Sequence, residues 1–174
     1  MEDSELARRI YRSSHLTGKF VLRSGKTSDE YFDKYLFESD PEILGEVAER
    51  LMKLVSPDVE VLAGLELGGI PIATAVSLRS RIPVVFVRKR PKEYGTKKMV
   101  EGIEIKGRHV CVIEDIITTG GQVIESAEAL RTLGAMVDSV LCVIVREKKA
   151  FQNLAGVGLT LQGLFAMDDL AKYA

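Results

Sequence analysis

Two adjacent carboxylates, Glu114 and Asp115, follow an apolar run and precede a loop of threonine and glycine residues. The segment reads VCVIEDIITTGGQ from Val110 to Gln122. Glycines allow a tight turn and let backbone amides approach a ligand closely. The threonine hydroxyls add hydrogen-bond donors, and a helix beginning at Gly121 would add unpaired amides and the positive end of its dipole. These features together predict a phosphate-binding pocket.

The carboxylates suit a different part of the same ligand, because like charges keep them away from a phosphate. A carboxylate accepts hydrogen bonds from hydroxyl groups, so a ligand with vicinal hydroxyls about one sugar ring away from a phosphate fits both halves. Ribose 5-phosphate has that shape. The alternative is a strand, turn and helix with capping threonines, which is the better interpretation of an isolated Thr-Gly-Gly. A Walker-type nucleotide loop is excluded because it requires Gly-Lys-Ser/Thr.

Apolar strands alternate with helices around this segment. The pattern predicts strands at residues 59–65, 84–87, 109–114, 137–145 and 159–165, and helices at 5–13, 41–55, 70–79, 121–133 and 168–173, with a short helix near 152–154 and a hairpin around Ser24-Gly25. We expect Asp40 to cap the helix at 41–55 and Pro41 to take its first position. Strands that are apolar on both faces belong in a parallel sheet covered by helices. The fold class is therefore α/β, with a doubly wound, mainly parallel sheet flanked by helices. Ligands bind such sheets at the carboxyl ends of the strands.

Length and charge limit the possible functions. A chain of 174 residues suits one domain with a single core, and we expect residues 1–174 to form it. The net charge of -1 argues against general nucleic-acid binding. Cys111 and Cys142 lie in apolar runs, where we expect buried thiols rather than a disulfide. No apolar run is long enough to span a bilayer, so we expect no membrane partner and a cytoplasmic protein.

The segment IEDIITTGGQ is similar to the phosphoribosyl-pyrophosphate motif of type I phosphoribosyltransferases. This resemblance implies the fold of that family, with a small N-terminal hood formed by residues 1–35. It also implies that Glu114 and Asp115 hold the ribose hydroxyls and that the following loop wraps the 5-phosphate. The donor-binding residues implied here are Glu114, Asp115, Ile116, Ile117, Thr118, Thr119, Gly120, Gly121 and Gln122.

Three further segments resemble the orotate-specific branch of this family, and the first two lie at residues 20–33 and 64–73. FVLRSGKTSDEYFD looks like its N-terminal segment, which implies that Arg23 reaches the pyrophosphate or the base, and that Tyr31 and Phe32 contact orotate. For Phe32 alone, a place in the hairpin core is the better interpretation. GLELGGIPIA resembles the pyrophosphate-binding turn, in which Leu67, Gly68 and Gly69 would present backbone amides. Many relatives carry a lysine or another polar residue at the position of Gly68.

A basic segment, VRKRPKEYGTKKMVEG, follows the strand that ends at Val87. A charge run is usually a solvated face, but this one looks like the family's mobile catalytic loop, residues 88–100. The resemblance implies that Arg88, Lys89 and Lys92 engage the pyrophosphate, and that part of the loop serves a partner subunit in a homodimer. Tyr94 stands where relatives often have histidine, so a cationic role at that position is in doubt.

Arg146 ends the strand VLCVIV, where the family's orotate-binding arginine falls. A guanidinium can grip a carboxylate with two parallel hydrogen bonds, and Thr118 would add a contact on the base side. The resemblance implies transfer of a phosphoribosyl group from phosphoribosyl pyrophosphate to orotate, with Lys92, Arg88 and Asp115 as the catalytic residues. It implies Mg²⁺ held by substrate oxygens and water rather than by the protein.

Two alternatives stay open at this point. The first is a phosphoribosyltransferase for a purine or uracil, against which Arg146 and the N-terminal segment argue. The second is a ligand-sensing transcriptional regulator with the same fold. Only about 20 residues precede Phe20, too few for a helix-turn-helix module.

Overall fold

A six-stranded sheet forms the centre of the computed structural model, which describes residues 1–22, 25–90 and 99–173. The strands are β3 (Val61–Leu65), β4 (Val84–Val87), β5 (Val100–Glu101), β6 (His109–Ile117), β7 (Met136–Val145) and β8 (Thr160–Ala166). They lie in the order β5-β4-β3-β6-β7-β8. Only the pair β4–β5 is antiparallel, and the other neighbours are parallel. The predicted doubly wound, mainly parallel sheet is confirmed.

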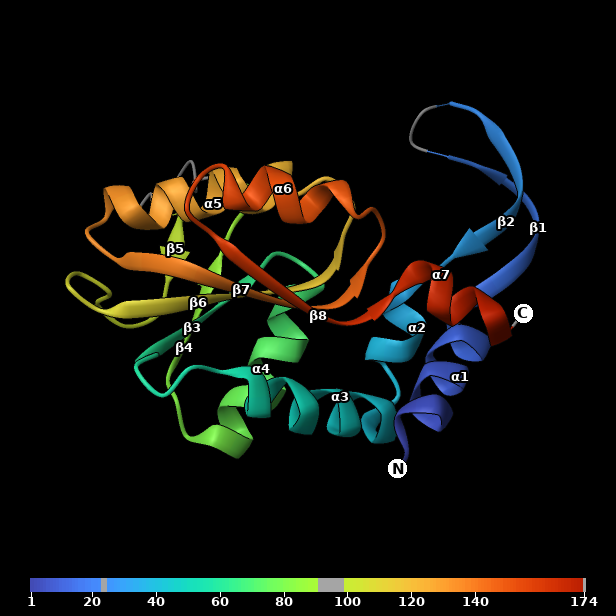
Figure 1. The fold of residues 1–174 in the computed structure, drawn as a ribbon, viewed down its shortest axis with the longest axis horizontal. Coiled ribbons are helices and arrows are strands. Elements are labelled where there is room, and N and C mark those ends of the chain that lie inside the picture. Colours follow the sequence, from blue (N-terminus) through green and yellow to red (C-terminus); the bar gives the residue numbers. More distant parts are fainter. Residues whose placement is uncertain (23–24, 91–98, 174) are drawn as a thin grey trace.

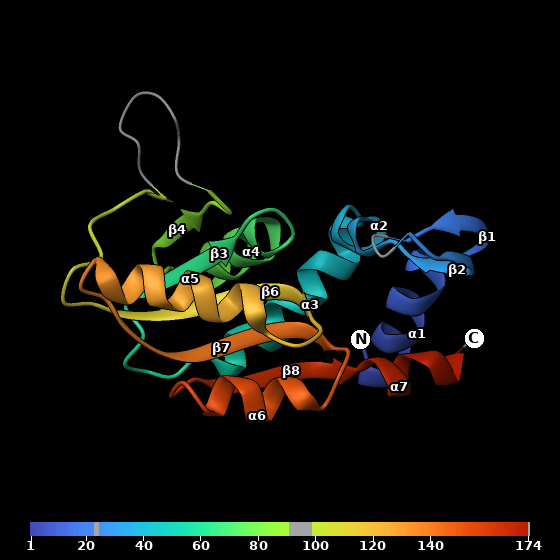
Figure 2. The ribbon, with the colours of Figure 1, turned by 90° about the horizontal axis from the view of Figure 1, so that it is seen from above.

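Helices cover both faces of this sheet (Figures 1 and 2). Helices α3 (Pro41–Leu54) and α4 (Gly69–Ser80) lie on one face, and α5 (Gly121–Thr132) and α6 (Lys149–Ala155) lie on the other. Each face has its own apolar core, and alternate residues of the central strands contribute to opposite cores. Strand β3 is consequently buried along its whole length. This arrangement leaves the carboxyl ends of the strands as the place where polar groups can gather.

The N-terminal segment forms a separate small layer. Helix α1 (Asp3–Ser14) leads into the antiparallel strands β1 (His15–Val21) and β2 (Thr27–Phe32), whose ribbon projects away from the central sheet in Figure 1. The short helix α2 (Lys34–Glu38) brings the chain back toward the sheet. Helix α1 also packs against α7 (Met167–Leu170) and the 3-10 turn Ala171–Tyr173, so the two chain termini lie near each other.

Several local expectations are confirmed. Asp40 caps α3 by accepting hydrogen bonds from the backbone amides of Glu42 and Ile43, at 2.9 and 3.1 Å, and Pro41 occupies the first turn. Cys111 and Cys142 are buried free thiols, as expected. Within the described residues, no helix combines the length and the apolar character that a membrane span requires.

Three elements differ from the sequence expectation. Strand β6 does not end at Glu114 but continues to Ile117, because it pairs with β7 through Ile117 and Val145. Helix α2 and strand β5 were not expected. Both are too short to show a hydrophobic period, and both depend on tertiary contacts. The consequence for the site is that Glu114 and Asp115 lie inside a strand rather than in the loop after it.

Candidate functional site

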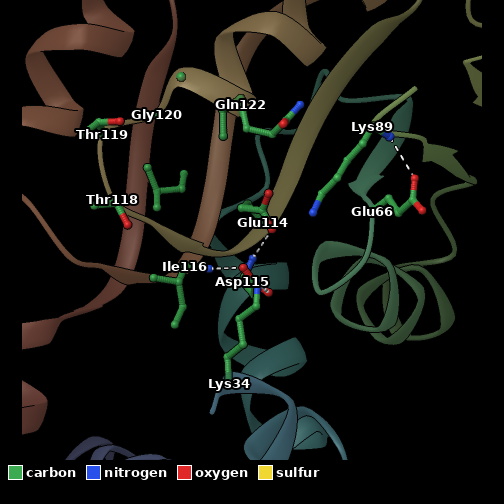
Figure 3. Close-up of a pocket in the computed structure, with 13 residues that line it drawn as sticks. Lys34, Glu66, Lys89, Glu114, Asp115, Ile116, Thr118, Thr119, Gly120 and Gln122 are labelled. Carbon is green, nitrogen blue, oxygen red and sulfur yellow. Dashed lines mark hydrogen bonds and ion pairs between the residues drawn. The ribbon is translucent and has the colours of Figure 1, made fainter. Parts of the chain in front are cut away.

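A cavity of about 340 Å³ opens at the carboxyl end of β6 (Figure 3). This volume is large enough for a small ligand. Its walls come from the acidic doublet, the loop after β6, the first turn of α5, and three residues from elsewhere in the chain. The lining residues are Lys34, Glu66, Lys89, Glu114, Asp115, Ile116, Ile117, Thr118, Thr119, Gly120, Gly121, Gln122 and Val123.

The loop after β6 is held in place by the helix that follows β7. Gly120 has a φ of 88°, and a Cβ there would lie 2.8 Å from Cδ1 of Leu154. Glycine is therefore required at this position by both its conformation and its surroundings. The side-chain amide of Asn153 donates to the carbonyl oxygen of Thr119 at 2.8 Å. No side chain of the described residues caps α5, so its first amides are left for a ligand in the adjoining cavity.

The acidic doublet is buried at the base of this cavity. Asp115 is completely buried and Glu114 is 8% exposed. The backbone amide of Asp115 donates to Oε1 of Glu114 at 2.9 Å, and the amide of Ile116 donates to Oδ1 of Asp115. Oδ2 of Asp115 forms an ion pair with Nζ of Lys34, the first residue of α2. The doublet is thus fixed from both sides before any ligand binds.

A third carboxyl group, from Glu38, joins this cluster from the other end of α2. Burial and then the neighbouring Asp115 raise the pKa of Glu38 to about 9. Burial and then Asp115 also raise the pKa of Glu114 well above its ordinary value. Burial alone would lower the pKa of Lys34, but its ion pair with Asp115 outweighs that effect and the pKa is raised. The cluster therefore combines one ion pair, Lys34 with Asp115, with the carboxyl groups of Glu38 and Glu114, whose raised pKa values favour their neutral forms.

The turn before α4 touches this cluster through Gly68. A Cβ at Gly68 would lie 1.6 Å from Oδ2 of Asp115 and 2.9 Å from Oε1 of Glu38, so only glycine fits here. Gly69 begins α4. Leu67 is 57% exposed and lines a separate cavity that it shares with Arg88. The predicted pyrophosphate turn is therefore adjacent to the acidic doublet, although its three residues do not line the cavity of Figure 3.

The basic segment is only partly described. The backbone amide of Lys89 donates to Glu66 at 2.9 Å, and Lys89 lines the cavity. Nε of Arg88 donates to Oε1 of Glu101 on β5 at 3.2 Å, which directs this side chain away from the cavity. The remaining predicted residues of this group, Lys92 and Tyr94, lie outside the described residues, as does Arg23 of the hairpin.

A second cavity, of about 370 Å³, adjoins the first. It lies between the N-terminal ribbon and the ends of β6 and β7, and its lining residues are Leu22, Ser28, Glu30, Tyr31, Phe32, Lys34, Ile116, Thr118 and Arg146. Lys34, Ile116 and Thr118 line both cavities. The structure thus places all four residues predicted for the acceptor, Tyr31, Phe32, Thr118 and Arg146, around one cavity.

The aromatic residues of the second cavity also have structural contacts. The ring of Tyr31 lies 5.5 Å from that of Phe20, and the ring of Phe32 lies 6.3 Å from that of Tyr11. Phe32 packs against the core beneath the ribbon, as its alternative interpretation proposed. Phe32 therefore belongs to both the hairpin core and the cavity wall.

Sequence reasoning missed Lys34, Glu38, Glu66 and Asn153. Helix α2 has only five residues and no detectable period, so nothing in the sequence indicates that Lys34 and Glu38 reach Asp115. Glu66 directly precedes the predicted turn at Leu67, so the sequence motif could have identified it. Asn153 gave no signal, because its contact with Thr119 depends on how α6 packs.

Residues 39–153 match the protein family described as the phosphoribosyl transferase domain. The chain is 48% identical over 168 residues to an orotate phosphoribosyltransferase of Nocardioides sp., a match that covers 97% of this chain and 94% of that protein. It is 37% identical over 172 residues to the orotate phosphoribosyltransferase of Methanocella arvoryzae, with 98% of both chains covered.

Solved structures give the same result. The crystal structure of Mycobacterium tuberculosis orotate phosphoribosyltransferase in complex with 5-phospho-alpha-D-ribosyl 1-diphosphate superposes with a TM-score of 0.82 at 27% identity, covering 97% of this chain and 98% of that one. Adenine phosphoribosyltransferase from Leishmania donovani superposes with a TM-score of 0.71 at 19% identity, which shows the shared fold alone.

Proposed function

The chain belongs to the phosphoribosyltransferase family, among the orotate phosphoribosyltransferases, and from this premise we propose that it converts orotate and phosphoribosyl pyrophosphate to orotidine 5′-phosphate and pyrophosphate. This is a step of de novo UMP biosynthesis. The observation that carries the proposal is the pair of adjoining cavities. One has a phosphate loop and an acidic doublet, the other has an arginine and two aromatic rings, and they share Lys34, Ile116 and Thr118.

In the first cavity, the residues of the motif bind the phosphoribosyl donor. The amides of the loop and of the first turn of α5 bind the 5-phosphate, and the hydroxyls of Thr118 and Thr119 add donors. Glu114 and Asp115 accept hydrogen bonds from the ribose hydroxyls. The Asp115 carboxyl group, which pairs with Lys34, also favours the positive charge that builds on the ribose ring as the bond to pyrophosphate breaks.

In the second cavity, orotate lies between Tyr31, Phe32 and Arg146. The guanidinium of Arg146 pairs with the orotate carboxylate, and Thr118 contacts the base. The wall shared by the two cavities brings the ring nitrogen of orotate to C1 of the ribose, so that alignment contributes much of the rate. No protein nucleophile takes part.

The departing pyrophosphate is stabilised by Arg88, Lys89, Lys92 and Arg23, with Leu67, Gly68 and Gly69 supplying amides and Tyr94 a hydroxyl. Arg88 has to leave Glu101 to reach it, since Nε of Arg88 bonds to Glu101 in the free protein. Among residues 1–22, 25–90 and 99–173, no group of three or more potential ligands could hold a metal ion. We propose that Mg²⁺, when bound, is held by the oxygens of the substrate and by water, where it would neutralise pyrophosphate charge.

We also propose a cytoplasmic homodimer in which residues 88–100 serve the site of the partner subunit. This arrangement is testable with mixed dimers of two inactive variants. When Lys92→Ala and Asp115→Asn chains are mixed, one site of each hybrid has both wild-type residues, and activity returns. A monomer in sedimentation, or no recovery on mixing, would overturn the shared site.

Initial rates with orotate, uracil, adenine and guanine as acceptors test the function itself. We expect turnover with orotate and none with adenine or guanine, because these bases have no carboxylate for Arg146. Asp115→Asn should weaken use of phosphoribosyl pyrophosphate, and Arg146→Met should raise KM for orotate. Activity on a purine without activity on orotate would refute the assignment, and stoichiometric DNA binding without turnover would favour a regulator.

A further inference from the structure

Lys34 holds a position that the proposed mechanism leaves unused. It is the first residue of α2, and its ammonium pairs with Oδ2 of Asp115. The side chain of Asp115 is 1% exposed, whereas that of Lys34 is 32% exposed. The buried partner thus fixes the ammonium in place, while part of the lysine side chain remains accessible from the cavities.

The same lysine lines both cavities, together with Ile116 and Thr118. Of these three residues, only Lys34 carries a charge. An ammonium group has three hydrogen-bond donors, and one of them is directed at Asp115. Since Lys34 has no other hydrogen bond or ion pair to residues 1–22, 25–90 and 99–173, two donors remain for a ligand at the junction where donor and acceptor meet.

The charges around the second cavity favour an anionic acceptor on the side where Lys34 lies. Among the described residues that line it, the two cations are Lys34 and Arg146, which come from different layers of the fold, α2 and the end of β7. Glu30 is its carboxylate, but the side chain of Glu30 is 70% exposed and pairs with His15 at 3.3 Å. The negative charge thus faces solvent on the ribbon, whereas the half-buried Lys34 and the exposed Arg146 supply positive charge at the cavity.

Two neighbours, Glu38 and Gly68, limit the negative charge and the crowding around the ion pair of Lys34 with Asp115. Glu38, one helical turn further along α2, is neutral at pH 7 because burial and Asp115 raise its pKa to about 9. Gly68 has no side chain, and any Cβ there would enter the space of the Asp115 carboxylate. Glu114 also acts on the Lys34 ammonium, but burial and Asp115 raise the pKa of Glu114, which weakens its negative charge. A second anion can therefore approach Lys34 beside its ion pair with Asp115.

We propose that Lys34 is a second cationic ligand of the acceptor carboxylate, acting with Arg146, and that its pairing with Asp115 links the acceptor site to the ribose site. The inference rests on the proposed function and adds to it a specificity-determining residue. Arg146 and Lys34 would bind the carboxylate from two sides. A pyrimidine without a carboxylate would leave the Lys34 ammonium without this partner.

The test compares two nucleotides that differ only in the carboxylate. Isothermal titration calorimetry measures the affinities of orotidine 5′-phosphate and uridine 5′-phosphate for wild type, Lys34→Met and Lys34→Arg. We expect Lys34→Met to reduce the preference for orotidine 5′-phosphate by about tenfold or more, as for a lost hydrogen bond to a charged group. Lys34→Arg keeps the charge and should retain most of the preference.

Lys53→Met is the matched control, because Lys53 pairs with Glu49 at 3.1 Å on the exposed face of α3 and should leave the preference unchanged. Equal weakening of both nucleotides by Lys34→Met would reduce Lys34 to a support of Asp115 and overturn the proposal. An unchanged preference would overturn it too. If Lys34→Met does not fold, Lys34→Gln carries the same expectations. A wild-type protein without orotate turnover would instead refute the proposed function.

Discussion

Replacing Gly68 with alanine adds one methyl group at the most crowded point of the site. The backbone of Gly68 has φ −69° and ψ −28°, which alanine adopts freely, so any effect is steric. The added Cβ would lie 1.6 Å from Oδ2 of Asp115, and this separation has to widen to at least the 3.4 Å of ordinary contact. Oδ2 is the oxygen that pairs with Lys34. Either the carboxylate or the turn must move.

We expect two effects of Gly68→Ala. Overpacking of this kind costs about 1–3 kcal/mol in the free energy of unfolding. If Asp115 positions the ribose as proposed, its displacement by more than about 1 Å should cost roughly a hundredfold in kcat/KM for phosphoribosyl pyrophosphate. Urea denaturation measures the first quantity, and initial rates at varied donor concentration measure the second.

Gly45→Ala provides the control. A Cβ at Gly45 would meet only the terminal guanidinium nitrogen of Arg79, at 3.0 Å, and that side chain can move aside. Gly45 lies inside α3, where alanine is favoured over glycine by about 0.5–1 kcal/mol. We expect Gly45→Ala to be as stable as wild type or more so, with unchanged turnover. Wild-type kinetics for Gly68→Ala would refute the packing argument and the placement of Asp115 with it.

Three further outcomes are expected. The first concerns Glu38→Gln. In the wild type, Glu38 has a pKa of about 9 in the folded protein and near 4.5 in the unfolded chain. The free energy of unfolding of the wild type therefore decreases as the pH rises from 4.5 to 9. The variant should lose this dependence, by up to about 1.4 kcal/mol per pH unit in urea denaturation, and parallel curves would contradict the buried neutral acid. Asn153→Ala removes the hydrogen bond to Thr119 and should raise KM for phosphoribosyl pyrophosphate, whereas Gln152→Ala should not. Lys92→Ala should lower kcat far more than substrate affinity, and an unchanged kcat in steady-state kinetics would remove Lys92 from the catalytic group.

The sequence alone determined the fold class and the ligand type. Strands that are apolar on both faces have no stable place outside a sheet covered by helices, so the doubly wound arrangement followed from composition and period. The doublet Glu114-Asp115 and the loop Thr118–Gln122 are contiguous in the chain, and a contiguous motif keeps its local geometry wherever the strand lies. For the same reason Asp40 and Pro41 were recognised as a helix start.

Only the tertiary structure decided what surrounds the acidic doublet. Lys34 and Glu38 lie about 80 positions before Asp115, on a helix too short to have a period, and they reach it because α2 folds back against the end of β6. The extension of β6 to Ile117 depended on its pairing with β7. Burial then raised the pKa values of Glu38 and Glu114, since desolvation depends on neighbours from several elements. Residue types predict the ligand of a contiguous motif, but the charge state of a buried cluster depends on contacts between distant segments.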